Sequence, residues 1–285
     1  MSADGSLPPE VEMVMRQKYG LDKPVLEQYF NYMKNFLRFD FGYSIKTYPG
    51  WYVVDLIRAK LPVTVMMNSI SLVFIIPVGL VLGIVAALNK DTWIDRLISF
   101  VVILFVSVPA FIFASMMQYF FAFRLGAFPV LFSSDVGMTP AKLHSMVLPV
   151  LAMSFGGIAG ITRILRAELI ETLNSEFILM ARSKGLTMKQ TVVRHAIRNS
   201  FIPMAGMIIG MFFGILGGSM VIENIFSIPG MGTLSVSSIN SGDHYPTMAN
   251  IFFYTLISLI SVLVVDLSYG VIDPRIRMGA GKRNV

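Results

Sequence analysis

The chain has 285 residues, of which 55% are hydrophobic and only 14% are charged, and its formal net charge is +6. Soluble domains usually carry charge on about a quarter of their residues, so this composition argues against a soluble globular protein. Cysteine is absent, which excludes disulfide bonds, thiol catalysis and thiolate metal sites. The excess positive charge does not indicate nucleic-acid binding, because the basic residues gather beside apolar segments.

The first 62 residues form a polar segment of ordinary composition. Residues 1–62 contain eight Lys and Arg, and the start of the chain has no apolar stretch typical of a secretory signal.

Charge-free apolar stretches follow this segment. About 20 apolar residues in a helix cross the hydrocarbon core, and a charge at mid-bilayer costs about 2.5–3.5 kcal/mol. The strongly apolar stretches without Asp, Glu, Lys or Arg are Val63–Leu88, Leu97–Phe123, Ser145–Thr162, Asn199–Ile222 and Met248–Val265. They favour an all-α, polytopic membrane helical bundle over the buried helices of a large soluble enzyme. We expect a transmembrane domain over 63–272, a tail over 273–285, and spans at about 63–88, 97–123, 145–165, 200–222 and 248–271.

The basic residues are distributed unequally between the two sides of such a bundle. If the spans alternate, then 89–96, 163–198 and the tail lie on one side and carry 13 Lys and Arg, against 2 in the opposite loops. Loops rich in Lys and Arg stay in the cytoplasm, so we expect the long loop and the C-terminus to be cytoplasmic.

This orientation places residues 1–62 outside the cytoplasm despite their basic residues. Long segments can be translocated regardless of charge, but something must direct them across the membrane. We therefore expect an upstream transmembrane helix that is missing from this sequence. A true five-span protein with an exported tail is the alternative.

The cytoplasmic loop 167–199 is predicted to form two short helices that are separated at Gly185. The first, around Glu168–Lys184, mixes apolar and charged residues at helical spacing. Thr187 and Gln190 have the spacing of a capping box, which predicts the start of the second helix. Glycine adopts a positive φ readily and can turn the chain between the helices. Such a hairpin could dock another protein or lie on the lipid surface as an amphipathic loop.

The sequence of this loop also carries a motif. The run Ala181-Arg182-Ser183-Lys184-Gly185 is followed, ten residues after the glycine, by His195-Ala196-Ile197-Arg198-Asn199. This pattern resembles the coupling loop of binding-protein-dependent ABC importer permeases, specifically the dipeptide, oligopeptide and nickel class.

In that family the loop sits in a groove of the ATPase subunit and transmits its closure to the membrane helices. Ala181 and Gly185 match the motif's small residues, and Ile197 matches a later apolar position. His195 stands in place of an apolar residue, and Arg198 in place of a proline. The resemblance implies an ATPase-coupling role for Ala181, Arg182, Lys184, Gly185, His195, Ile197, Arg198 and Asn199.

Other segments resemble the same family in the same order along the chain. Gly20–Pro24 and Asp40–Ser44 resemble its external loop after the first span, and Asp266 with Asp273-Pro274-Arg275 resembles its C-terminal end. The run from Glu223 to Gly232 resembles the signature after the fifth family span. Its extracytoplasmic signature residues are Glu223, Phe226, Pro229, Gly230 and Gly232. From its place at a span end, Glu223 is expected to cap a helix or to meet a binding protein outside.

The resemblance implies a six-span transmembrane subunit of an ABC importer that moves peptides or similarly small solutes across the plasma (inner) membrane. The implied partners are a second permease subunit, two ABC ATPase subunits and an extracytoplasmic solute-binding protein, with no cofactor or metal. An ion-coupled secondary transporter is the alternative, but such carriers place ionisable groups deep in the membrane. A membrane-embedded enzyme comes third, because HExxH, GxSxG and Gly-rich phosphate loops are absent from the sequence.

Glycines recur every four residues along one predicted span, at Gly206, Gly210, Gly214 and Gly218. Small residues at this spacing let another helix approach closely. The stripe predicts either static packing within this subunit or a sliding contact with a partner permease or the pathway. Pro77 and Pro109 lie inside predicted spans and are expected to kink them.

Overall fold

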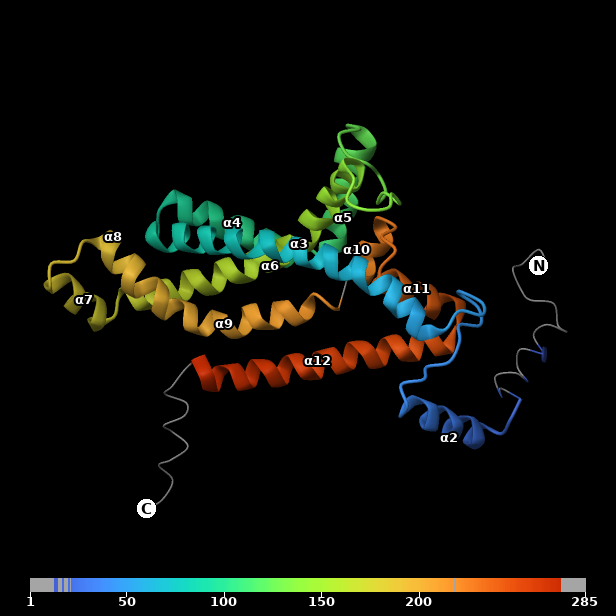
Figure 1. The fold of residues 1–285 in the computed structure, drawn as a ribbon. Coiled ribbons are helices and arrows are strands. Elements are labelled where there is room, and N and C mark those ends of the chain that lie inside the picture. Colours follow the sequence, from blue (N-terminus) through green and yellow to red (C-terminus); the bar gives the residue numbers. More distant parts are fainter. Residues whose placement is uncertain (1–12, 15–16, 18–19, 21, 218, 273–285) are drawn as a thin grey trace, which may run out of the picture. The chain divides into compact units, whose positions relative to one another are not determined.

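The structure is a computed structural model that describes residues 13–14, 17, 20, 22–217 and 219–272. The described residues are helical and contain no strand, which confirms the all-α expectation for this part of the chain (Figure 1). The helices are α2 (Val25–Phe36), α3 (Val53–Leu88), α4 (Trp93–Ser107), α5 (Ala110–Met117), α6 (Pro140–Leu173), α7 (Glu176–Ser183), α8 (Met188–Thr191), α9 (Ile197–Gly214), α10 (Met220–Ile225), α11 (Met231–Ser241) and α12 (His244–Ile272). Two π-helical segments, η1 (Gln118–Arg124) and η2 (Val192–Ala196), continue α5 and α8.

The chain divides into two compact units, one of Met1–Lys60 with Leu234–Phe253 and one of Leu61–Thr233 with Tyr254–Val285. The α11–α12 connection thus belongs to one unit with the N-terminal segment, a grouping that the sequence did not predict.

In the first unit, the carboxylate of Asp243 holds the loop that follows α2. Asp243 is buried, and the Ser44 hydroxyl donates to its Oδ2 at 2.6 Å. The backbone N–H groups of Lys46 and Thr47 donate to the same oxygen at 3.0 and 2.9 Å. A buried carboxylate requires such donors, because an unpaired charge is costly away from water. One aspartate therefore fixes the loop 44–47 against the start of α12.

The second unit has its core around α6. Gly79 and Gly83 of α3 face α6, and a Cβ on them would lie 2.8 Å from the Ile161 Cβ and 2.9 Å from the Leu165 Cβ. The two helices approach this closely because glycine presents no side chain, as small-residue packing in membranes predicts.

Within the described residues, three helices are long and apolar enough to cross a membrane, namely α3, α6 and α12 over His244–Val271. Two bent pairs pass the same test, Trp93–Ser107 with Ala110–Arg124 and Met188–Phe201 with Pro203–Gly214. If each bent pair is one span, the described residues offer five spans, the number that the sequence predicts.

Two of the expected spans are not continuous helices. The segment 97–123 breaks between α4 and α5, whose axes differ by 99°. Val108 is extended (φ −96°, ψ 123°) and Pro109 precedes α5, so the chain leaves the helix rather than kinking within it. A proline forces the preceding residue toward extended backbone, which explains the break. By contrast, α3 continues through Pro77.

The expected span 200–222 is also interrupted. Helix α9 ends at Gly214, a turn follows over 215–217, and α10 begins at Met220 with Ser219 as its N-cap. Glycine disfavours helix by about 1 kcal/mol per residue, so a glycine-rich stretch ends the helix before the apolar stretch ends.

Candidate functional site

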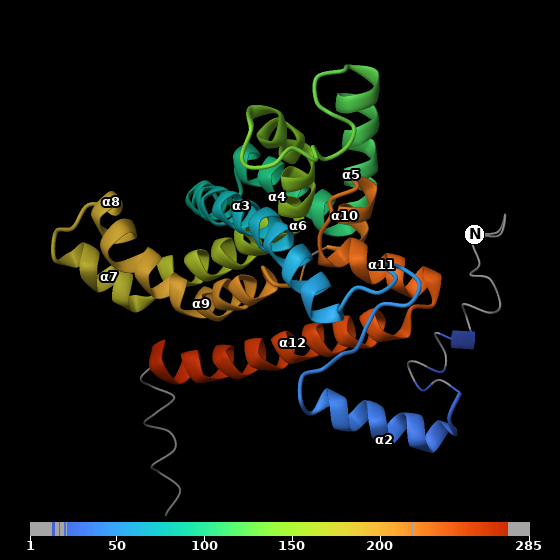
Figure 2. The same ribbon diagram turned by 45° about the vertical axis from the view of Figure 1, so that its right-hand side comes forward.

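The loop after α6 forms a helical hairpin, α7–α8–η2, at one end of α6 and α9 in both views (Figures 1 and 2). Gly185 has φ +86° and turns the chain, as predicted. The capping box is also confirmed: Thr187 Oγ1 accepts from the N–H of Gln190 at 3.3 Å, and Gln190 Oε1 accepts from the N–H of Thr187 at 3.0 Å. The hairpin is therefore fixed at its turn by local geometry.

The first helix of the hairpin is shorter than the sequence suggested. Residues 168–173 belong to α6, which ends at Leu173, and α7 begins at Glu176. Ser175 is extended, and its hydroxyl donates to the Thr172 carbonyl at 2.6 Å. Ser and Asn favour helix ends because their short side chains bond nearby backbone groups. The pair Asn174-Ser175 was the signal for this break.

The inner face of the hairpin is part of the core of the second unit. Ile178 and Ala196 are buried in the same cluster as Leu165 and Leu169 of α6 and Met204 of α9. The motif residue Ala181 is also buried, so its small size fits a packed position. Motion of the hairpin is thereby tied to α6 and α9.

The outer face of the hairpin exposes both apolar and basic side chains. The exposed apolar residues are Phe177, Leu179, Met180, Met188 and Val193. The exposed basic residues are Arg182, Lys184, Lys189 and Arg194. Val192 is buried, whereas the next residue, Val193, is exposed. Both lie in η2, whose π-helical turn has a different register from an α-helix.

The later motif residues lie on η2 and at the start of α9. His195 is half-buried, and its ring meets that of Phe177 edge-on at 5.5 Å, which joins η2 to α7. Ile197 is half-buried and Asn199 is exposed. Arg198 lies in α9, and its side chain is outside the described part. The structure thus brings His195 to the first helix of the hairpin, a contact that the sequence did not predict.

An ion pair that the sequence did not predict joins α4 to the part of α6 that leads to the hairpin. Arg166 of α6 donates to both oxygens of Asp95 in α4, with two bonds of 2.6 Å. The side chain of Asp95 is only 4% exposed, while that of Arg166 is 31% exposed. Such bidentate pairs fix geometry as well as charge. The two residues flank charge-free stretches at ends that were expected on one side of the membrane, which is the signal that could have paired them.

The signature segment surrounds the buried carboxylate of Glu223. Thr64 Oγ1 of α3 donates to Glu223 Oε1 at 3.0 Å, and the N–H groups of Gly232 and Thr233 donate to Oε2 at 2.7 and 3.3 Å. These N–H groups belong to the first turn of α11, so Glu223 caps that helix, as the sequence suggested. Its side chain is fully buried, so the expectation that it meets a binding protein outside is wrong for this conformation.

The glycines of the signature segment are required by this carboxylate. A Cβ on Gly230 would overlap the Glu223 carboxylate and the Thr64 hydroxyl, and one on Gly232 would lie 2.7 Å from the Met220 Cα. Phe226 is buried, whereas Pro229 is exposed. Burial raises the pKa of the Glu223 carboxyl above its ordinary value, and the bonds from Thr64, Gly232 and Thr233 oppose that rise.

The glycines of the stripe differ in how closely other atoms approach them. A Cβ on Gly206 would overlap the Tyr269 ring of α12, whereas one on Gly210 would make ordinary contact with Val265 at 3.9 Å. A Cβ on Gly214 would meet nothing, and Gly218 lies outside the described residues. Static packing therefore explains Gly206 but not Gly210 or Gly214.

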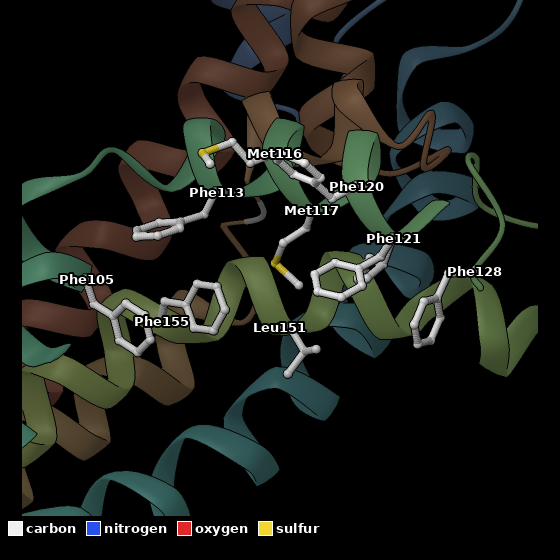
Figure 3. Close-up of a pocket in the computed structure, with 10 residues that line it drawn as sticks. Phe105, Phe113, Met116, Met117, Phe120, Phe121, Phe128, Leu151 and Phe155 are labelled. Carbon is white, nitrogen blue, oxygen red and sulfur yellow. The ribbon is translucent and has the colours of Figure 1, made fainter. Parts of the chain in front are cut away.

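An apolar pocket of about 420 Å³ lies between α4, α5, η1 and α6 (Figure 3). Phe105 and Phe155 stack with centroids 4.4 Å apart, and Phe113 meets both rings edge-on. The pocket is lined by Phe, Met and Leu side chains, which carry no charge and no oxygen or nitrogen atom. Among the described residues, no group of three or more His, Cys, Asp or Glu is placed to hold a metal.

These features define a multi-pass membrane protein of the permease class. Residues 79–278 match the family described as binding-protein-dependent transport system inner membrane component. The chain belongs to this family, so it is a transmembrane subunit of an ABC importer in the inner membrane and not an enzyme.

Similar proteins with curated names are peptide permeases. The dipeptide transport system permease protein DppB of Lactococcus lactis subsp. cremoris is 36% identical over 95% of this chain and 87% of that protein. DppB of Bacillus subtilis is 37% identical over 94% of this chain and 84% of that protein. The oligopeptide transport system permease protein OppB of Haemophilus influenzae is 34% identical over 97% of this chain and 88% of that protein.

Solved structures share the fold. The MetNI methionine ABC transporter in an inward-facing conformation matches with a TM-score of 0.62 and 16% identity, over 76% of this chain and 96% of the matched chain. An amino acid ABC transporter with histidines matches with a TM-score of 0.56, 16% identity, and coverage of 76% and 94%.

Proposed function

We propose that this subunit imports peptides. The observation that carries the proposal is the similarity to DppB and OppB proteins at 34–37% identity over nearly the whole chain. The loop motif resembles a class of permeases that also includes nickel importers, so nickel is the second candidate substrate.

We further propose that the hairpin over 176–199 docks on an ABC ATPase at the cytoplasmic face. Its outer side combines apolar and basic side chains that the described part of this chain does not cover. Its inner side shares a core cluster with α6 and α9. ATPase closure against the outer face would thus move both helices as one body, because packed side chains transmit displacement.

The ion pair and the signature carboxylate extend this coupling. Asp95 and Arg166 join α4 to α6 close to the hairpin, so α4 follows the motion of α6. Glu223 and Thr64 join α3 to the α10–α11 segment, which we assign to the extracytoplasmic side. A second permease and a solute-binding protein complete the proposed importer.

The test is uptake by vesicles that contain the subunit and its co-purified partners. Labelled dipeptides and longer peptides should accumulate only when ATP is supplied on the hairpin side. Accumulation driven by a proton or sodium gradient without ATP would instead support the secondary-transporter alternative. Uptake of nickel with no uptake of peptide would replace the proposed substrate.

A further inference from the structure

Helix α2 in the first unit has an apolar face that is only partly covered. Tyr32 and Phe36 pack against Tyr245 and Phe252 of α12. Next to them runs a stripe of exposed apolar side chains. This stripe consists of Val25, Leu26, Tyr29 and Phe30, with exposed fractions of 80%, 72%, 56% and 66%.

The covered and exposed stripes are neighbours around the helix. At about 100° per residue, Val25 falls on the line through Tyr32 and Phe36. From that line the exposed stripe continues around the helix, and Met33 lies within it, between Tyr29 and Leu26. Glu27, Asn31 and Lys34 occupy the other side. One flank of α2 therefore packs on protein, the adjacent face is apolar and uncovered, and the remaining face is polar.

The contact with α12 sets the depth of α2 relative to the apolar layer. The rings of Phe36 and Phe252 are 4.6 Å apart. Phe252 lies within the charge-free stretch that begins at Met248, in a helix long and apolar enough to cross a membrane. Figures 1 and 2 both show α2 alongside the end of α12 that adjoins α11. A helix bound at that level borders the lipid rather than bulk water.

We propose that α2 lies in the plane of the bilayer surface, with Val25, Leu26, Tyr29 and Phe30 in the boundary between headgroups and acyl chains. Tyrosine and phenylalanine side chains suit this boundary, and amphipathic helices bury their apolar face about 5–10 Å into it. Lys34 suits anionic headgroups, whereas the ammonium of Lys23 is paired with Glu27 at 2.7 Å. The lipid would thereby anchor the segment that Asp243 fixes to the start of α12.

Because the chain lacks cysteine, single-cysteine probes can test this directly. Leu26→Cys and Phe30→Cys report on the exposed stripe, and Asn31→Cys and Asn35→Cys are matched controls on the polar side of the same helix. Each full chain is labelled with an environment-sensitive fluorophore and reconstituted in vesicles of phosphatidylcholine and phosphatidylglycerol. Iodide quenches from water, and nitroxide-bearing lipids quench from the acyl region.

Labels at 26 and 30 should be quenched several-fold more by the nitroxide lipids than by iodide, and the controls should show the reverse. Equal iodide quenching at all four positions would overturn the proposal. Protection of 26 and 30 that appears only on adding the solute-binding protein would also overturn it, in favour of a protein contact.

Discussion

At the scale of single residues, Glu223 shows how one carboxylate arranges a motif. Its partners are all donors: the Thr64 hydroxyl and the N–H groups of Gly232 and Thr233. The neighbouring glycines leave room for it, since a Cβ on Gly230 would overlap it. The signature segment is thus arranged around the Glu223 carboxylate as a hydrogen-bond acceptor. Replacing this acceptor with a donor would destabilise the segment.

We predict that Glu223→Gln destabilises the subunit by about 1–3 kcal/mol, because the amide NH₂ would face a donor in a buried position. Unfolding by heat in detergent would measure the change. Thr64→Val is the companion variant on α3: it leaves the carboxylate but removes both the donor to Glu223 and the acceptor of the Met231 N–H. A Gln variant as stable as the wild type would show that the three bonds do not hold the segment.

The same residue predicts a pH dependence. Burial raises the pKa of Glu223, so between its ordinary and its raised pKa the folded chain binds the proton more tightly than the unfolded chain. The free energy of unfolding contributed by this group therefore falls as pH rises through that window. Glu223→Gln should remove this part of the slope when melting curves are compared from acidic to neutral pH. An unchanged slope would mean that Glu223 does not titrate differently on folding.

Gly185 allows a sharper functional test. Its φ of +86° is strained for any other L-residue, by about 1–2 kcal/mol, and a Cβ there would meet no other atom. We predict that Gly185→Val leaves membrane insertion intact but uncouples ATP hydrolysis from uptake, because the turn of the hairpin is distorted. Gly156→Ala is the control, since its Cβ also meets nothing and its backbone is helical. Normal coupling in the valine variant would contradict a docking role for the hairpin.

At the scale of elements, the α4–α6 contact depends on a charge pair near the hairpin. Removing one partner of a fully buried pair costs about 3–5 kcal/mol, and Arg166 is partly exposed, so we expect about 1–3 kcal/mol for Asp95→Asn. The exchange Asp95→Arg with Arg166→Asp should recover part of the stability. Thermal unfolding and the ratio of ATP hydrolysed to solute moved measure both effects. If Asp95→Asn lowers neither the thermal stability nor the coupling ratio, and the charge exchange restores nothing, the ion pair does not contribute to coupling.

The glycine stripe separates packing within the chain from contact with a partner. Gly206→Leu should reduce the folded yield, because its side chain would overlap Tyr269 of α12. Gly210→Leu should fold, because its Cβ makes only ordinary contact, yet we expect it to abolish transport or assembly. The yield of folded monomeric chain measures the effect on folding, and the yield of the assembled complex measures the effect on partner contact. Normal uptake and normal complex yield for Gly210→Leu would exclude the stripe from the mechanism.

At the scale of the whole molecule, the orientation of the hairpin decides the proposed mechanism. A cysteine at Gln190 in the hairpin should react with a membrane-impermeant maleimide only from the cytoplasmic side. A cysteine at Asp135, in the loop between η1 and α6, should react only from the other side. The opposite result would reverse the topology and exclude the hairpin as the ATPase contact.

The sequence by itself determined the class of the protein. Charge-free stretches of span length, the distribution of Lys and Arg, and the motif around Gly185 are local properties, since each depends on residues close along the chain. Local chemistry also determined the capping box at Thr187 and the positive φ of Gly185. The helix breaks at Pro109 and Gly214 were harder to predict from the sequence. The apolar stretches continue through both positions, so hydropathy does not mark where the helices end.

Only the tertiary structure decided which distant residues meet. Asp95 and Arg166, Glu223 and Thr64, and Asp243 and Ser44 are partners that lie far apart along the chain. The sequence places Asp95 and Arg166 at span ends that are expected on one side of the membrane, but it does not show that these two residues meet. Such contacts depend on how the helices pack rather than on local spacing. The division of the glycine stripe has the same origin, since whether a glycine is required depends on what the fold places against it.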